Sequence, residues 1–209
     1  MPMFNQAPVS GDIESFDTLL ALPSPSVGAV YTVLAPLVTN GAVGTRWVFD
    51  GSVWRPAGAQ LMWSLPSKVD GISGGSTSAQ VLMQITLPPK LLLCLRRINV
   101  RARYTYSRAD MAVRGARLRI GPTTGLENII ASATVAANTL QNVLPAMYSF
   151  VAGEMRATGP SNTGHTTPDT EEDATTGDRN SELKLSFVVQ QGAGATATVS
   201  LVVAELEIA

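Results

Sequence analysis

Residues 97–106 read RINVRARYTY, a stretch in which polar and apolar side chains alternate over ten positions. Successive side chains of a β-strand point to opposite faces of a sheet, so this alternation predicts a long strand with one buried face. Residues 80–87, 116–120 and 183–190 alternate in the same way. The sequence therefore predicts several antiparallel strands that bury their apolar faces against one another.

A last long strand is predicted over residues 195–208. Its polar side chains move from even positions to odd positions: Thr196, Thr198 and Ser200, then Glu205 and Glu207. One extra residue in a strand shifts the alternation by one position, so we expect a β-bulge near Val202 or Val203.

The whole pattern predicts an all-β chain: a small N-terminal β-hairpin/meander module followed by an antiparallel jelly-roll-like β-sandwich, with an up-and-down barrel as the alternative to the sandwich. The expected divisions are an N-terminal anchoring segment at 1–22, the small β module at 23–63, a Gly/Ser-rich linker at 64–79 and the sandwich head at 80–209. Within the first segment, apolar spacing predicts a short helix over 13–22, capped by Ser10 or Asp12.

Composition limits the classes of function. The chain has 209 residues, of which 45% are hydrophobic and 15% charged, and its formal net charge is −1. This content suffices for a core, and the near-zero net charge argues against nucleic-acid binding. We also expect no membrane insertion, because no run of about 18 apolar residues exists, and we find no sign of a targeting segment.

Few residues have the chemistry of an active site or a metal site. Cys94 is the single cysteine and stands in an apolar run, which indicates a buried thiol, while His165 is the single histidine and stands in a polar stretch. An acidic run lacks the residue order of a calcium-binding loop, which favours a solvated loop over a calcium site; it comprises Asp169, Glu171, Glu172, Asp173 and Asp178. We therefore expect no catalysis, no metal and no cofactor.

Nine of the fifteen basic residues lie between Lys90 and Arg119. Alternation places Arg97, Arg101 and Arg103 on one face of one strand, and Arg117 and Arg119 on one face of another. One interpretation is an anion site for phosphate, lipopolysaccharide or an acidic sugar. The other is cross-strand pairing, within or between subunits, with the acidic residues of the late strands: Glu182, Glu205 and Glu207.

A hairpin is predicted around Asp50-Gly51, because this dipeptide is a strong turn signal between two strands. Trp47 and Trp54 stand on either side of the turn. We expect them to pack in a small core or as a cross-strand pair of the module, in preference to forming a ligand platform.

This region resembles a small module of tailed-bacteriophage structural proteins. The resemblance rests on Leu-Pro at 22–23, Val-Gly followed by Tyr-x-Val at 27–33, Gly-Thr at 44–45 and Asp-Gly-x-x-Trp-x-Pro at 50–56. It implies a virion component such as a short tail fibre, a head fibre or a capsid decoration protein. Such proteins are commonly homotrimers whose N-terminal segments dock on capsid or tail proteins and whose distal domains face the host.

The sequence thus favours a non-enzymatic virion structural protein, made in the host cytoplasm and exposed on the particle, where it either adheres to a host-surface glycan or reinforces the shell. The alternative is a free carbohydrate-binding module or lectin-like domain, and a third class is a glycan hydrolase or depolymerase.

Overall fold

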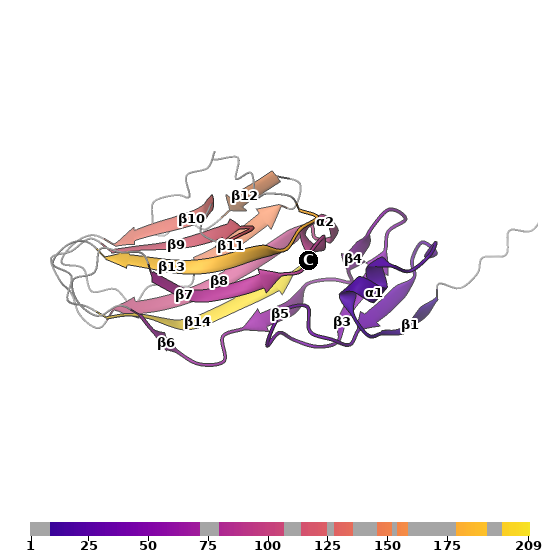
Figure 1. Ribbon diagram of the computed structural model, residues 1–209, viewed down its shortest axis with the longest axis horizontal. Coiled ribbons are helices and arrows are strands. Elements are labelled where there is room, and N and C mark those ends of the chain that lie inside the picture. The colour runs from indigo at the N-terminus through magenta and orange to yellow at the C-terminus, as the bar shows by residue number, and fades with distance from the viewer. Residues whose placement is uncertain are drawn as a thin grey trace, which may run out of the picture.

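The computed structural model describes residues 9–71, 80–106, 114–124, 128–135, 146–151, 154–158, 179–191 and 198–209 (Figure 1). Two sheets form an elongated sandwich, and a smaller sheet lies at one end of it. All strand pairings within the two sandwich sheets are antiparallel. The predicted all-β antiparallel sandwich is therefore confirmed.

Each sandwich sheet is built from strands that are distant in sequence. The four-stranded sheet has the order β10-β9-β13-β7 and comprises β7 (Gln80–Leu87), β9 (Arg114–Gly121), β10 (Asn128–Val135) and β13 (Leu183–Gln191). The six-stranded sheet has the order β12-β11-β8-β14-β5, with β6 also paired to β14; its strands are β5 (Gln60–Ser64), β6 (Val69–Asp70), β8 (Arg97–Tyr106), β11 (Ala146–Val151), β12 (Glu154–Thr158) and β14 (Val199–Ile208).

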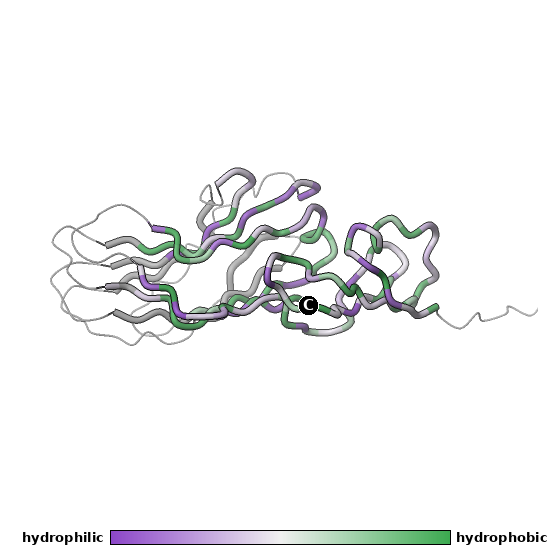
Figure 2. Tube along the Cα trace, turned by 60° about the horizontal axis from the view of Figure 1, so that its bottom comes forward, coloured by the Kyte–Doolittle hydropathy of each residue, from purple (hydrophilic) through white to green (hydrophobic). Residues whose placement is uncertain are grey.

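The alternation predicts the buried side of β8 correctly, whereas β13 buries both of its sides. In β8, Ile98, Val100 and Ala102 are buried while Arg97 and Arg101 are exposed. Ser186 and Val188 lie on the outward side of β13 and are only 0% and 2% exposed, so the predicted outward, polar position of Ser186 is wrong. Figure 2 shows the alternation as repeated changes of colour along the strands. The predicted bulge in β14 is confirmed, because the register against β8 shifts between Leu201 and Val203.

A second bulge changes one predicted core position. The register between β13 and β7 shifts between Phe187 and Val188, which leaves Leu82 as the extra residue of β7. Leu82 and Met83 are consequently both buried, and Val81 is exposed. The regular alternation predicted over 80–87 is wrong at Val81 for this reason.

The small sheet has the order β1-β2-β3-β4 and comprises β1 (Ser10–Ile13), β2 (Val30–Val33), β3 (Thr45–Phe49) and β4 (Trp54–Pro56). The meander β2-β3-β4 is antiparallel, whereas β1 runs parallel to β2 and is joined to it through α1 (Phe16–Leu20).

The helix is shorter than predicted, and the predicted caps are wrong. Ser10, Asp12 and Ile13 belong to β1, where Ile13 pairs with Val33. The helix begins only at Phe16, because Ser15 is the N-cap and its Oγ accepts a hydrogen bond from the backbone N–H of Thr18 at 3.2 Å.

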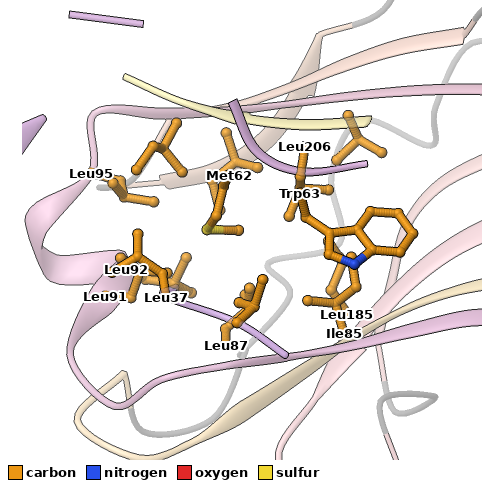
Figure 3. Packing of buried hydrophobic residues seen from close by; sticks show 14 of the residues in the cluster. Leu37, Met62, Trp63, Ile85, Leu87, Leu91, Leu92, Leu95, Leu185 and Leu206 are labelled. Atoms are coloured by element: carbon orange, nitrogen blue, oxygen red, sulfur yellow. The ribbon is translucent and has the colours of Figure 1, made fainter. Parts of the chain in front are cut away.

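The small sheet and the sandwich share one hydrophobic core (Figure 3). Leu37 follows β2, Met62 lies on β5, and Leu91 and Leu92 lie on the short helix α2 (Leu91–Cys94); all four are buried in the same cluster. The predicted boundary at residue 63 falls within β5, which pairs with β14 of the sandwich. The predicted linker 64–79 contains β6, which also pairs with β14.

Polar contacts add to this junction. The Gln60 side chain binds both backbone groups of Arg46 on β3: its Oε1 accepts from the Arg46 N–H at 2.6 Å, and its Nε2 donates to the Arg46 carbonyl at 2.7 Å. The Arg55 guanidinium on β4 donates to the carbonyl of Leu93 in α2 at 3.3 Å. Each contact joins the small sheet to a different element of the sandwich.

The β3–β4 hairpin is organised by Asp50. Its Oδ1 accepts hydrogen bonds from the backbone N–H groups of Ser52 and Val53, both at 2.9 Å, and its Oδ2 accepts from Arg55 Nε at 3.1 Å. These donors favour the carboxylate, with the two backbone groups contributing most, and lower the pKa of Asp50 to about 2. Gly51 follows at φ +102°, a conformation that favours glycine.

Gly41→Ala is predicted to destabilise the junction. A Cβ at this position would lie 2.8 Å from the Met62 carbonyl oxygen, the Val38 carbonyl oxygen and Val38 Cγ2, so backbone would have to move. We expect a loss of about 1–3 kcal/mol in the free energy of unfolding, measured by urea denaturation. Gly11→Ala on β1 is the control, because its nearest neighbour would be the flexible Tyr31 side chain at 3.4 Å. Equal stability of the two variants would contradict the prediction.

Asp50→Asn is predicted to lower the melting temperature in a pH-dependent way. Because the pKa of Asp50 is lower in the folded chain than its usual value of 3.8, its stabilising effect is complete above about pH 4 and is lost as the pH falls towards 2. The difference in melting temperature between wild type and variant should therefore be constant near neutral pH and should shrink below pH 4. Asp12→Asn, which removes an exposed carboxylate on β1, is the comparison. A difference that does not change with pH would contradict this account.

Candidate interaction surface

The structure divides the arginine cluster between the two sheets of the sandwich. Arg97 and Arg101 lie on β8 of the six-stranded sheet, and Arg117 and Arg119 lie on β9 of the four-stranded sheet. Their neighbours in each strand are buried in the core, so the two pairs of arginines lie on opposite outer faces. Arg103 belongs to β8 as well, and its side chain lies outside the described part of the structure.

On the six-stranded sheet, basic and acidic side chains face outward from adjacent strands. Arg101 Nη1 and Glu205 Oε2 are 3.2 Å apart, and the two residues are direct partners in the register of β8 and β14. Asn99 and Glu207 are the next outward partners along these strands. These four residues and Val100 line a shallow hollow. We call the outer surface formed by Arg97, Asn99, Arg101, Glu205 and Glu207 the charged face.

The expected cross-strand pairing is thus present at Arg101 and Glu205. Their side chains are 49% and 36% exposed, so water screens the attraction and the pair contributes about 1 kcal/mol or less. Within the described part of the chain, Arg97 and Glu207 make no ion pair. Glu182, the third acidic residue of the prediction, is exposed just before β13.

The outer face of the four-stranded sheet is covered in part by its own chain. Gln84 Nε2 donates to the Thr124 carbonyl at 2.7 Å and to Ser186 Oγ at 3.0 Å, and Lys184 Nζ donates to the Thr123 carbonyl at 2.9 Å. Residues 122–124 are held against the sheet in this way. Burial and, secondly, the charge of Arg117 lower the pKa of Arg119 on the same face.

Trp47 and Trp54 lie in the core of the small sheet, 0% and 4% exposed. The ring of Trp47 lies 5.0 Å from that of Phe16 in α1, and its indole N–H donates to Thr45 Oγ1 at 3.0 Å. Trp54 contacts Tyr31 edge-to-face at 5.7 Å and Phe49 at 5.3 Å. In the strand register Trp47 pairs with Pro56 and Trp54 with Phe49, so each tryptophan packs with different partners.

Cys94 is 3% exposed, and burial raises the pKa of its thiol to about 11, so it is a protonated core side chain at neutral pH. His165 and the acidic run at 169–178 lie outside the described residues. The part of the chain that the structure describes contains no group of three or more His, Cys, Asp or Glu side chains able to hold a metal. It also contains no helix long and apolar enough to cross a membrane.

The residues that join the small sheet to the sandwich could not be found from the sequence. Gln60 and Arg55 bind partners that are distant in sequence, and Gly41 is required by the backbone atoms packed around it. None of these features produces a periodic pattern in the sequence. The Asp50-Gly51 turn, in contrast, is a local signal and could be found.

No protein-family model matches this chain, and no curated protein matches it. Among solved structures, it is similar to a chain in the structure of infectious bursal disease virus, Gx strain, with a TM-score of 0.34, 12% identity and coverage of 90% of this chain and 39% of that one. It is also similar to the VP2 subviral particle of the same virus, with a TM-score of 0.32, 12% identity and coverage of 90% and 50%.

Our chain spans half or less of these chains from viral particles.

The Arg101–Glu205 pair is predicted to have a small coupling energy. A double-mutant cycle with Arg101→Ala and Glu205→Ala, measured by denaturant unfolding, should give about 0.2–1 kcal/mol at low salt and less at high salt. A salt-independent coupling well above that range would show that the pair is desolvated by something beyond the single chain.

Proposed function

We propose that this chain is a non-enzymatic structural protein of a tailed-bacteriophage virion, exposed on the particle as a trimeric short fibre, head fibre or capsid decoration protein. The N-terminal segment and the small sheet dock on a capsid or tail protein, and the sandwich projects outward. Adhesion to a host-surface glycan is a second role that the outward end can serve in this arrangement.

The observation that carries the proposal is the joint between the two parts. The segment that resembles the phage module is the β2-β3-β4 meander with its Asp50-centred turn. This meander shares one continuous core with the sandwich and is tied to it through Gln60 and Arg55. A protein that is anchored at one end and projects from a particle needs such a fixed orientation, whereas two freely linked domains would not provide it.

The tryptophans favour this proposal over a free carbohydrate-binding module. A sugar-stacking platform requires exposed aromatic faces. All three tryptophans are buried, with Trp47, Trp54 and Trp63 exposed by 0%, 4% and 7%, and they serve the core. The low content of charged residues also fits a chain whose surface is partly covered in an assembly.

The test is made on particles of the virus that encodes the chain. Quantitative mass spectrometry and cryo-electron microscopy of purified virions should find it in a copy number divisible by three. Tens to hundreds of copies on the capsid would make it a decoration or head-fibre protein, and a few trimers at the tail a fibre. Its absence from purified virions would overturn the proposal.

A matched variant tests the docking end. Removal of residues 1–8 deletes the part of the anchoring segment that precedes β1. We expect fewer copies of this variant in purified particles, and its melting temperature is measured to establish that it folds. Incorporation at the wild-type level would show that residues 1–8 take no part in docking.

A further inference from the structure

We infer that the charged face of the six-stranded sheet is the surface through which copies of this chain associate with one another. The inference deepens the proposed function, on which it rests for the expectation of several copies, by naming the residues that meet. Its occupant is a second copy of this chain.

The charges on this face are arranged in two parallel stripes. The basic stripe, Arg97 and Arg101, lies on β8, and the acidic stripe, Glu205 and Glu207, lies on the adjacent strand β14. Within a single chain Arg101 and Glu205 are opposite one another in the strand register and 3.2 Å apart. Arg97 and Glu207 are offset diagonally by two residues, and neither makes an ion pair among the described residues. One charge of each sign is therefore available to another molecule.

Rotational symmetry makes such a face complementary to itself. Consider a rotation axis parallel to the strands and in front of the face. The rotation keeps the height of each residue along the axis and brings the basic stripe of one copy towards the acidic stripe of the next. Closed assemblies of identical chains are built from such axes, and a threefold axis gives the trimer of the proposed function. Arg101 then lies level with Glu205 of the next copy, and Arg97 two residues from the level of Glu207.

An apolar side chain lies beside the charged residues. Leu61 on β5, 45% exposed, pairs with Glu207 in the register and adds apolar surface beside the acidic stripe. Partial exclusion of water at the contact strengthens each ion pair relative to the exposed pair of the single chain.

The test exchanges the two unpaired charges. Arg97→Glu and Glu207→Arg each place like charges opposite one another in the assembly, and each should weaken association of the purified full-length chain at least about tenfold in sedimentation velocity. The double variant R97E/E207R restores opposite charges with reversed polarity and should recover wild-type association. High salt should weaken the wild-type assembly.

Arg46→Glu is the control for Arg97→Glu, because it makes the same change of net charge at an exposed arginine of the small sheet. Melting temperatures of all variants establish that they fold. An assembly unaffected by R97E and E207R, a double variant that remains dissociated, or a wild-type chain that stays monomeric at its highest soluble concentration would overturn the inference. The proposed function is judged separately, by the presence of the chain in purified virions.

Discussion

The burial of apolar side chains at the junction between the small sheet and the sandwich is the constraint on which the rest of the structure depends. A four-stranded sheet with one short helix encloses too few side chains to be stable alone. Here Leu37, from the segment after β2, is buried together with Met62 of β5 and Leu91 of α2. Full burial of each such side chain contributes roughly 1.5–3 kcal/mol to the free energy of unfolding. Separation of the two parts would expose several of these side chains and lose that stabilisation.

The polar contacts at the junction have a different role. Each hydrogen bond of Gln60 to Arg46, or of Arg55 to Leu93, contributes only about 1 kcal/mol net. Their directions, however, are fixed. The Gln60 amide binds β3 as the backbone of a neighbouring strand would, and this sets the register between two sheets that share no strand ladder. Apolar burial thus holds the parts together, and the hydrogen bonds define their orientation.

Features of the fold could be predicted where the sequence pattern lies within a single strand, and could not where they depend on other parts of the chain. Alternation in residues 97–106 is a property of one strand, and it predicts the buried face correctly over residues 97–102, where the structure describes burial. The bulge in β14 could also be predicted, because it shifts the alternation of its own strand. The bulge in β7 could not, because Leu82 and Val81 are both apolar and either fits the core phase. The parallel strand β1 could not be predicted, because its last residue, Ile13, also fits the apolar spacing of the helix expected over 13–22, and four residues are too few to distinguish the two periods.

The candidate surface shows the same division between local and distant signals. The sequence placed Arg97 and Arg101 on one strand face and named Glu205 and Glu207 as partners, because alternation alone determines which side chains point outward. The sequence does not show that Arg117 and Arg119 lie on the other sheet of the sandwich. The sheet to which a strand belongs depends on chain connections that cross the core. In a chain with so few charged residues, two opposite stripes on adjacent strands determine how the outer face meets other molecules. The strand pairing that builds the sandwich therefore also places the basic and acidic side chains in two adjacent stripes on its outer face.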